Sequence, residues 1–196
     1  DKIIANSSYT AKLAENIGIP ANFITVIPPG VELQNSPVNA TATEEFLSRY
    51  DLKDRKILLS VGRLAKRKGL REFVKYSLPK IVEADSRAIL AVIGEEPTNS
   101  LASKSQRIQD ILEEAKKQGL SDRIRFLGKV DNQTLSQAYE TASVHIFPVK
   151  HSDTDPEGFG MVAIEAAAHG LPTVAFATGG VIDAVSDGET GYLIDN

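Results

Sequence analysis

KILLSVGR, residues 56–63, is the stretch that decides the fold class. From Ile57 to Val61 the residues are apolar apart from one serine, which is typical of a strand buried on both faces of a parallel sheet. A second such run, AILAVI, follows at residues 88–93. Together with other short β-branched runs, they predict strands at residues 2–5, 23–27, 56–61, 88–93, 124–127, 144–147, 173–176 and 191–194.

Helical stretches are predicted between these strands. Several end at a glycine, as at Gly18, Gly119 and Gly170, which is a common helix stop signal. The predicted helices cover residues 8–16, 70–83 with a kink or break near Pro79, 103–118, 132–142 and 160–169. Alternating strands and helices indicate an α/β protein with a Rossmann-like, doubly wound parallel sheet.

Composition narrows the class of protein. The chain has 196 residues, of which 42% are hydrophobic, which fits one compact domain with an appended piece. The 22 basic residues are spread among 26 acidic ones, so we expect no nucleic-acid partner. The absence of cysteine excludes disulfides and thiolate metal sites, and no run of 18 apolar residues occurs.

A change in pattern predicts where structural units meet. Pro28-Pro29-Gly30-Val31 and the polar residues after it interrupt the alternation of strands and helices. We therefore expect residues 1–31 to be the remnant of a preceding domain with the crossing that follows it. Residues 32–54 are predicted to be a linker and short helix, and residues 55–196 a nucleotide-binding domain that is truncated at its C-terminus.

A basic turn follows the strand at residues 56–61. Gly62 allows close approach, Arg63 offers a planar fork that suits phosphate oxygens, and Lys66-Arg67-Lys68 add positive charge. A solvated basic turn is the alternative. However, cations at a helix N-terminus oppose the helix dipole, so their placement here suggests that an anion offsets them.

Two acids lie near the start of the predicted helix at residues 160–169, one before it and one within it. Glu157 lies in the preceding loop, and Gly158 and Gly160 would let backbone N–H groups approach a ligand. Glu165 lies among small apolar residues, where a carboxylate needs partners, and a ribose diol would supply them. The alternatives are an ordinary first-turn acid for Glu157 and a buried ion pair for Glu165.

Other motifs give weaker signals. Gly179-Gly180 before a short helix could hold a phosphate or form a tight turn, and Gly94-Glu95-Glu96-Pro97 is another turn at a strand end. The three histidines form no cluster or triad, neither a nucleophile elbow nor a P-loop occurs, and we assign no metal.

Taken together, these motifs resemble the retaining GT-B glycosyltransferases of the group 1, family four type. The resemblance covers nearly the whole chain, and its order makes it specific. It is carried by residues 5–8, 26–31, 61–63, 68–69, 126–130, 147–148, the pair Glu157 and Glu165, 170–172, 179–180 and 187–192. Residues 1–31 would accordingly belong to the N-terminal acceptor domain, and the rest to the C-terminal half of a GT-B fold.

The resemblance implies roles for individual residues. Arg63 and Lys68, beside Gly62, match positions that neutralise the donor diphosphate. Glu157 matches the acid that contacts the transferred sugar, and Glu165 matches the ribose-binding acid. Further positions implied to bind the donor are the base-binding edge Gly128, Lys129 and Val130, the backbone of Phe159, Gly160 and Met161, and Val162 beside the diphosphate.

The expected function is that of a hexosyltransferase, with this chain binding the nucleotide-diphosphate sugar and the isolated fragment inactive. We expect no metal or other cofactor. The acceptor, a glycan, lipid or small molecule, would bind through the missing domain, as would any membrane. We expect a location in the cytoplasm or on the cytoplasmic face of a membrane. The alternatives are a noncatalytic nucleotide-sugar-binding module and another GT-B enzyme, such as a nucleotide-sugar epimerase.

Overall fold

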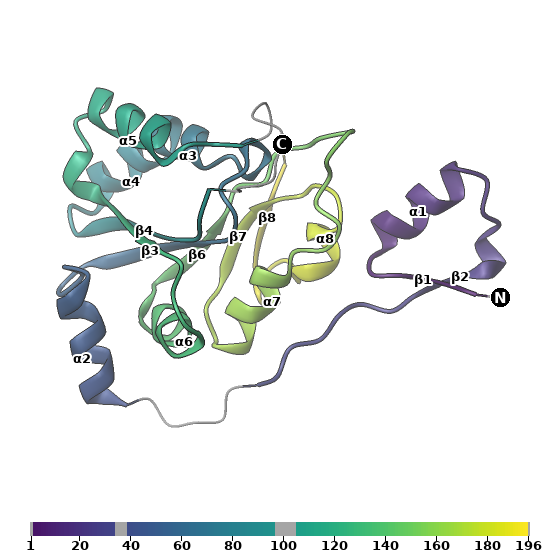
Figure 1. Ribbon diagram of the computed structural model, residues 1–196, viewed down its shortest axis with the longest axis horizontal. Coiled ribbons are helices and arrows are strands. Elements are labelled where there is room, and N and C mark those ends of the chain that lie inside the picture. Colours follow the sequence, from purple (N-terminus) through teal and green to yellow (C-terminus); the bar gives the residue numbers. More distant parts are fainter. Residues whose placement is uncertain (1, 34–38, 97–104, 196) are drawn as a thin grey trace.

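The computed structural model describes residues 2–33, 39–96 and 105–195. A small unit comes first, with parallel strands β1 (Ile3–Ala5) and β2 (Ile24–Val26) joined through helix α1 (Ser8–Asn16). Residues 27–33 then run without regular secondary structure toward the second, larger unit (Figure 1). Residues 28–31, where the sequence predicts a break in the alternation, have no regular secondary structure.

The larger unit is built on one parallel sheet with strand order β5-β4-β3-β6-β7-β8. Strand β3 lies in the middle, between β4 and β6. The chain adds β4 and β5 on one side of β3 and then β6, β7 and β8 on the other, so the direction in which the parallel strands are added reverses beside β3. Such a switch point is where open α/β sheets bind ligands. The predicted parallel, doubly wound sheet is confirmed, with strands β3 (Lys56–Val61), β4 (Ala88–Ile93), β5 (Ile124–Gly128), β6 (Val144–Phe147), β7 (Thr173–Phe176) and β8 (Gly191–Ile194).

Helices cover both faces of this sheet (Figure 1). Leu58 and Leu90 pack on the side of α3 (Leu70–Tyr76), α4 (Leu78–Ala84) and α5 (Ile108–Lys117). Leu59 and Ile89 belong to a second core cluster on the other face. That face carries α2 (Ala40–Arg49), α6 (Asn132–Thr141), α7 (Met161–Ala168) and α8 (Val181–Ala184). Strands buried on both faces explain the apolar run at residues 88–93 and the nearly apolar run at residues 57–61.

Residues 32–54, predicted to be a linker and short helix, include helix α2. Helix α2 buries Phe46, and Leu52 after it is 1% exposed, both in the core cluster that also contains Leu59. This part of the segment therefore packs with the sheet. The predicted break near Pro79 is also found, because α3 ends at Tyr76 and α4 begins at Leu78, which puts the proline in the first turn of α4.

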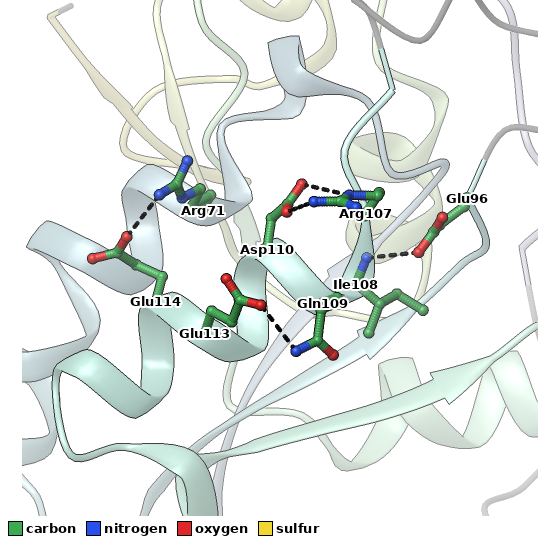
Figure 2. A network of polar contacts seen from close by, with 8 residues as sticks. All are labelled: Arg71, Glu96, Arg107, Ile108, Gln109, Asp110, Glu113 and Glu114. Atoms are coloured by element: carbon green, nitrogen blue, oxygen red, sulfur yellow. Dashed lines mark hydrogen bonds and ion pairs between the residues drawn. The ribbon is translucent and has the colours of Figure 1, made fainter.

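The helix predicted over residues 103–118 begins later, at Ile108; residues 103 and 104 lie outside the described residues. Ser105 forms a bridge with Ala65 instead, and the Gln106 amide donates to the Leu64 carbonyl at 3.0 Å. Glu96 then caps α5, since its carboxylate accepts from the Ile108 amide at 2.7 Å (Figure 2). The prediction was wrong for 105–107, because Ser105 and Gln106 pair with the turn after β3 and Arg107 is the residue that precedes the first turn of α5.

Two further contacts fix α5 and the small unit. Arg71 of α3 pairs with Glu114 of α5 at 3.1 Å, which ties the two helices together (Figure 2). In the small unit, the Ser7 hydroxyl donates to the Gly158 carbonyl at 2.6 Å.

No helix within the described ranges has the length and apolar character that crossing a membrane requires.

Candidate donor-binding site

Three glycine turns form a continuous edge at the carboxyl ends of the central strands. The Gly62 amide donates to the Ile93 carbonyl at 2.9 Å, and the Gly94 amide donates to the Gly128 carbonyl at 3.0 Å. All three glycines have positive φ angles, and a Cβ atom on Gly94 would lie 1.9 Å from the Gly62 oxygen. The predicted phosphate turn and the predicted base-binding edge therefore lie along one edge of the sheet.

The basic turn is held against the end of β6. Residues 66–68 form one 3-10 turn, Gly69 is left-handed, and α3 starts only at Leu70. A Cβ atom on Gly69 would meet the Pro148 oxygen at 2.0 Å, and the Lys150 amide donates to the Arg67 carbonyl at 2.7 Å. The sequence placed the basic residues at the start of a helix, and the structure corrects this, because the 3-10 turn intervenes.

Glu157 is the anion that offsets these cations. Its carboxylate accepts from the Lys68 ammonium at 2.6 Å and also pairs with Arg67. The guanidinium Nε of Arg67 lies 3.2 Å from Asp155 Oδ2 as well. Sequence reasoning had not assigned Arg67 a site role, because three basic residues in a row give no sign of which one turns toward the loop. The structure thus joins Lys68 to Glu157. Arg67 and Lys68 do not form the solvated basic turn that was the alternative, and Glu157 is not a first-turn acid of α7.

The electrostatics of this pair follow from partial burial. The side chains of Lys68 and Glu157 are 18% and 13% exposed. Burial lowers the pKa of Lys68, although the Glu157 charge opposes the shift. Burial by itself would raise the pKa of Glu157, but Lys68 and Arg67 outweigh burial and hold that pKa below its usual value. Glu157 is consequently ionised near neutral pH.

Lys68 packs over an aromatic ring. The Lys68 ammonium lies 4.6 Å from the centre of the Phe147 ring, and the Phe147 ring stacks on the His145 ring with their centres 5.7 Å apart. His145 is fully buried, and its pKa falls to about 3 because of burial and the nearby Lys68 charge. A neutral histidine beneath Phe147 adds no competing charge to the site.

A narrow pocket of about 10 Å³ runs beside Lys68. The exposed Arg63 and the buried Gln106, whose Oε1 atom has no partner among the described residues, both contribute to its wall. Gly62, Arg63 and Lys68 are therefore brought together, as the sequence predicted. The remaining wall is formed by Ser60, Val61, Leu64, Ala65, Leu70, Phe147 and Pro148.

The glycines around Glu157 allow close packing of two loops. The Gly180 amide donates to the Glu157 carbonyl at 2.8 Å, and a Cβ atom on Gly180 would lie 2.0 Å from the Gly158 oxygen. For Gly179-Gly180 this contact favours the tight-turn interpretation over a phosphate cradle. Gly160, with φ +110°, starts α7 beside the buried Phe159. Met161 is exposed, while Val162 packs partly into the core below.

Glu165 lies away from the Lys68 pair, in the wall of a different cavity of about 260 Å³ between α6 and α7. Its carboxylate accepts from the Tyr139 hydroxyl at 3.0 Å. Within the described ranges no cation lies at ion-pair distance from it, so the buried ion pair considered as an alternative is not found. On the neighbouring edge, Lys129 is exposed and Val130 packs partly into the core.

The parallel, doubly wound sheet defines a Rossmann-like half of a GT-B fold, and comparison with known proteins agrees. The family model for glycosyl transferases group 1 matches residues 43–196. The chain belongs to this family.

Relatives over the whole chain are enzymes of this kind. A GDP-mannose-dependent alpha-(1-6)-phosphatidylinositol monomannoside mannosyltransferase of Mycobacterium tuberculosis is 30% identical over 100% of this chain and 49% of its own length. A D-inositol 3-phosphate glycosyltransferase of Geodermatophilus obscurus is 33% identical over 100% of this chain and 42% of its own. The chain thus spans about half the length of the curated relatives it matches.

A solved structure shows the same fold. The Anabaena protein HepE in complex with UDP-glucose superposes with a TM-score of 0.82 at 20% identity, covering 99% of this chain and 50% of that one.

Proposed function

We propose that this chain binds the nucleotide-diphosphate sugar donor of a retaining glycosyltransferase, and that the full-length enzyme transfers the sugar to an acceptor. The observation that carries the proposal is the pairing of Arg67 and Lys68 with Glu157 at the sheet's switch point, with Arg63 in the pocket wall beside Lys68. Cations that lie beside one carboxylate suit a ligand with a diphosphate and a sugar. The diphosphate would form ion pairs with the cations, and the carboxylate would accept hydrogen bonds from the sugar hydroxyls.

The donor would lie along the edge formed by the three glycine turns. Lys68 and Arg63 would neutralise the diphosphate and stabilise it as a leaving group, so that the chemistry needs no metal ion. Glu157, with the backbone of Phe159, Gly160 and Met161, would hold the sugar. Glu165 would bind the ribose, with the base toward Gly128, Lys129 and Val130, and Val162 would lie near the diphosphate.

The acceptor, a glycan, a lipid or a small molecule, would bind through the other half of the enzyme. The proposal also places the enzyme in the cytoplasm or on the cytoplasmic face of a membrane. A noncatalytic sugar-nucleotide-binding module would share the donor contacts. The full-length protein separates the two, because only a transferase releases nucleoside diphosphate when an acceptor is supplied. A nucleotide-sugar epimerase would instead change the sugar without needing an acceptor.

Calorimetric titration of this chain with UDP, GDP and ADP, and then with their sugar conjugates, tests donor binding. We expect one base to be preferred and binding to be unchanged by EDTA, because the chain's own cations neutralise the diphosphate. Lys116→Ala removes an exposed lysine on α5 away from the site, so this variant should bind the nucleotides as the parent chain does and is the control for Lys68→Ala. A folded chain that binds none of these nucleotides, as judged by circular dichroism, contradicts the proposal.

A further inference from the structure

The cavity between α6 and α7 contains a hydrogen-bond arrangement that the donor contacts above leave unexplained. Tyr139 lies in its wall opposite Glu165 and is only 2% exposed. Both helices contribute, together with the segment before α2, through Val31, Glu32, Asn132, Leu135, Ser136, Ala168 and His169. A buried phenol needs a partner for its hydroxyl, and here the partner is the carboxylate.

The Tyr139 ring is fixed by two imidazoles. His169 stacks on it with ring centres 5.1 Å apart and planes 26° from parallel, and His145 meets it edge-on at 6.3 Å. His169 is itself held, since its Nδ1 lies 2.8 Å from the Glu165 carbonyl oxygen and its Nε2 lies 2.9 Å from the Ser136 hydroxyl. The Tyr139 ring is therefore held by one stacked ring and one edge-on ring, which together limit where its hydroxyl can point.

This geometry fixes the carboxylate as well. The Tyr139 hydroxyl donates to Glu165 Oε2 at 3.0 Å, and burial followed by the Glu165 charge raises the pKa of the phenol, so it stays a donor. Glu165 Oε1 accepts no hydrogen bond from any side chain or backbone group in the described ranges. One oxygen is thus held by the protein, and the other is available at the cavity wall.

We propose that Tyr139 is a positioning residue that holds Glu165 so that Oε1 accepts from the ribose 2′-hydroxyl. The inference rests on the proposed function, because it takes the cavity ligand to be the nucleoside of the donor. Tyr139 acts through the carboxylate. A carboxylate without this anchor would rotate freely and would lose the directional bond that separates ribose from deoxyribose.

The test compares each ribonucleoside diphosphate that binds with its 2′-deoxy form, in the parent chain, Tyr139→Phe, Glu165→Ala and the double variant. We expect Tyr139→Phe to bind the ribonucleotide about fivefold more weakly and the deoxynucleotide unchanged, as for loss of one directed hydrogen bond. In the Glu165→Ala background, Tyr139→Phe should change neither affinity. Tyr50→Phe is the matched control, since Tyr50 packs on Phe46 in α2.

The outcomes separate the two proposals. A parent chain that binds no nucleotide overturns both, whereas binding with an unchanged ribose preference in Tyr139→Phe overturns only the role of Tyr139. An equal loss for ribose and deoxyribose also overturns it, because a purely structural effect does not depend on the 2′-hydroxyl. If Tyr139→Phe does not fold, Glu165→Asp, whose carboxylate is one methylene shorter, should lose the preference, and a full preference in that variant overturns the inference.

Discussion

Lys68 and Glu157 are 89 positions apart in the chain, yet their ammonium and carboxylate groups lie 2.6 Å apart. The Glu157 carboxylate therefore pairs with cations that a bound diphosphate would also pair with. Replacing Glu157 with glutamine should raise the affinity for a bare nucleoside diphosphate by about threefold, the size expected for a partly exposed ion pair. The same change should remove any extra affinity that the sugar confers. Calorimetry with both ligands measures this, and an equal fall for both would contradict it.

Lys68→Ala and Arg63→Ala should each weaken binding of nucleoside diphosphates by roughly tenfold, because a charged hydrogen bond to phosphate contributes about 1.5 kcal/mol or more. Nucleosides without phosphate should bind unchanged. Unaltered diphosphate affinity in folded variants would rule out this assignment of the phosphate site.

Acid should weaken the fold partly through Glu157. Its pKa is lowered in the folded chain, so the stability it contributes is present above its ordinary value of 4.5 and is lost as the pH falls through the lower folded value. The difference in unfolding free energy between the parent and Glu157→Gln should therefore shrink as the pH falls below 4.5. Urea unfolding at several pH values measures the difference, and one that is independent of pH would be inconsistent with the ion pair.

Gly94→Ala should be strongly destabilising. The added Cβ atom would lie 1.9 Å from the Gly62 carbonyl oxygen, at a φ angle of +143°. We expect a loss of about 3 kcal/mol or more in unfolding free energy. Gly119→Ala is the control, because Gly119 also has a positive φ but no atom within 4 Å of the new methyl group. Similar losses in the two variants would show that strain in φ, and not the clash, dominates.

Local pattern was sufficient to predict much of the larger unit. The limits of β3 and β4 follow from apolar runs buried on both faces, and the break before α4 follows from the missing amide of Pro79. Contacts between distant segments could not be predicted in this way. The start of α5 depends on Gln106 pairing with Leu64, a contact that periodicity does not encode.

The same limit applies to the candidate site. Gly62, Arg63 and Lys68 follow one another closely in sequence, so their meeting at one pocket was predictable. Nothing in their order indicates that Arg67 would pair with Glu157, since this depends on the loop from β6 folding back over the 3-10 turn. Tyr139 was missed for the same reason, because its partner Glu165 is on another helix.

The contact between Ser7 and the Gly158 carbonyl joins the small unit to the residue that follows Glu157. Ser8 adds a bond from its hydroxyl to Asp183 at 2.7 Å, so the start of α1 is attached at two points. This constrains how chimeric enzymes can be assembled. A graft that exchanges residues 1–27 for those of another group 1 transferase gives the loop around Glu157 a new neighbour. Under the proposed function, donor selectivity and the choice of residues 1–27 are therefore not independent design variables.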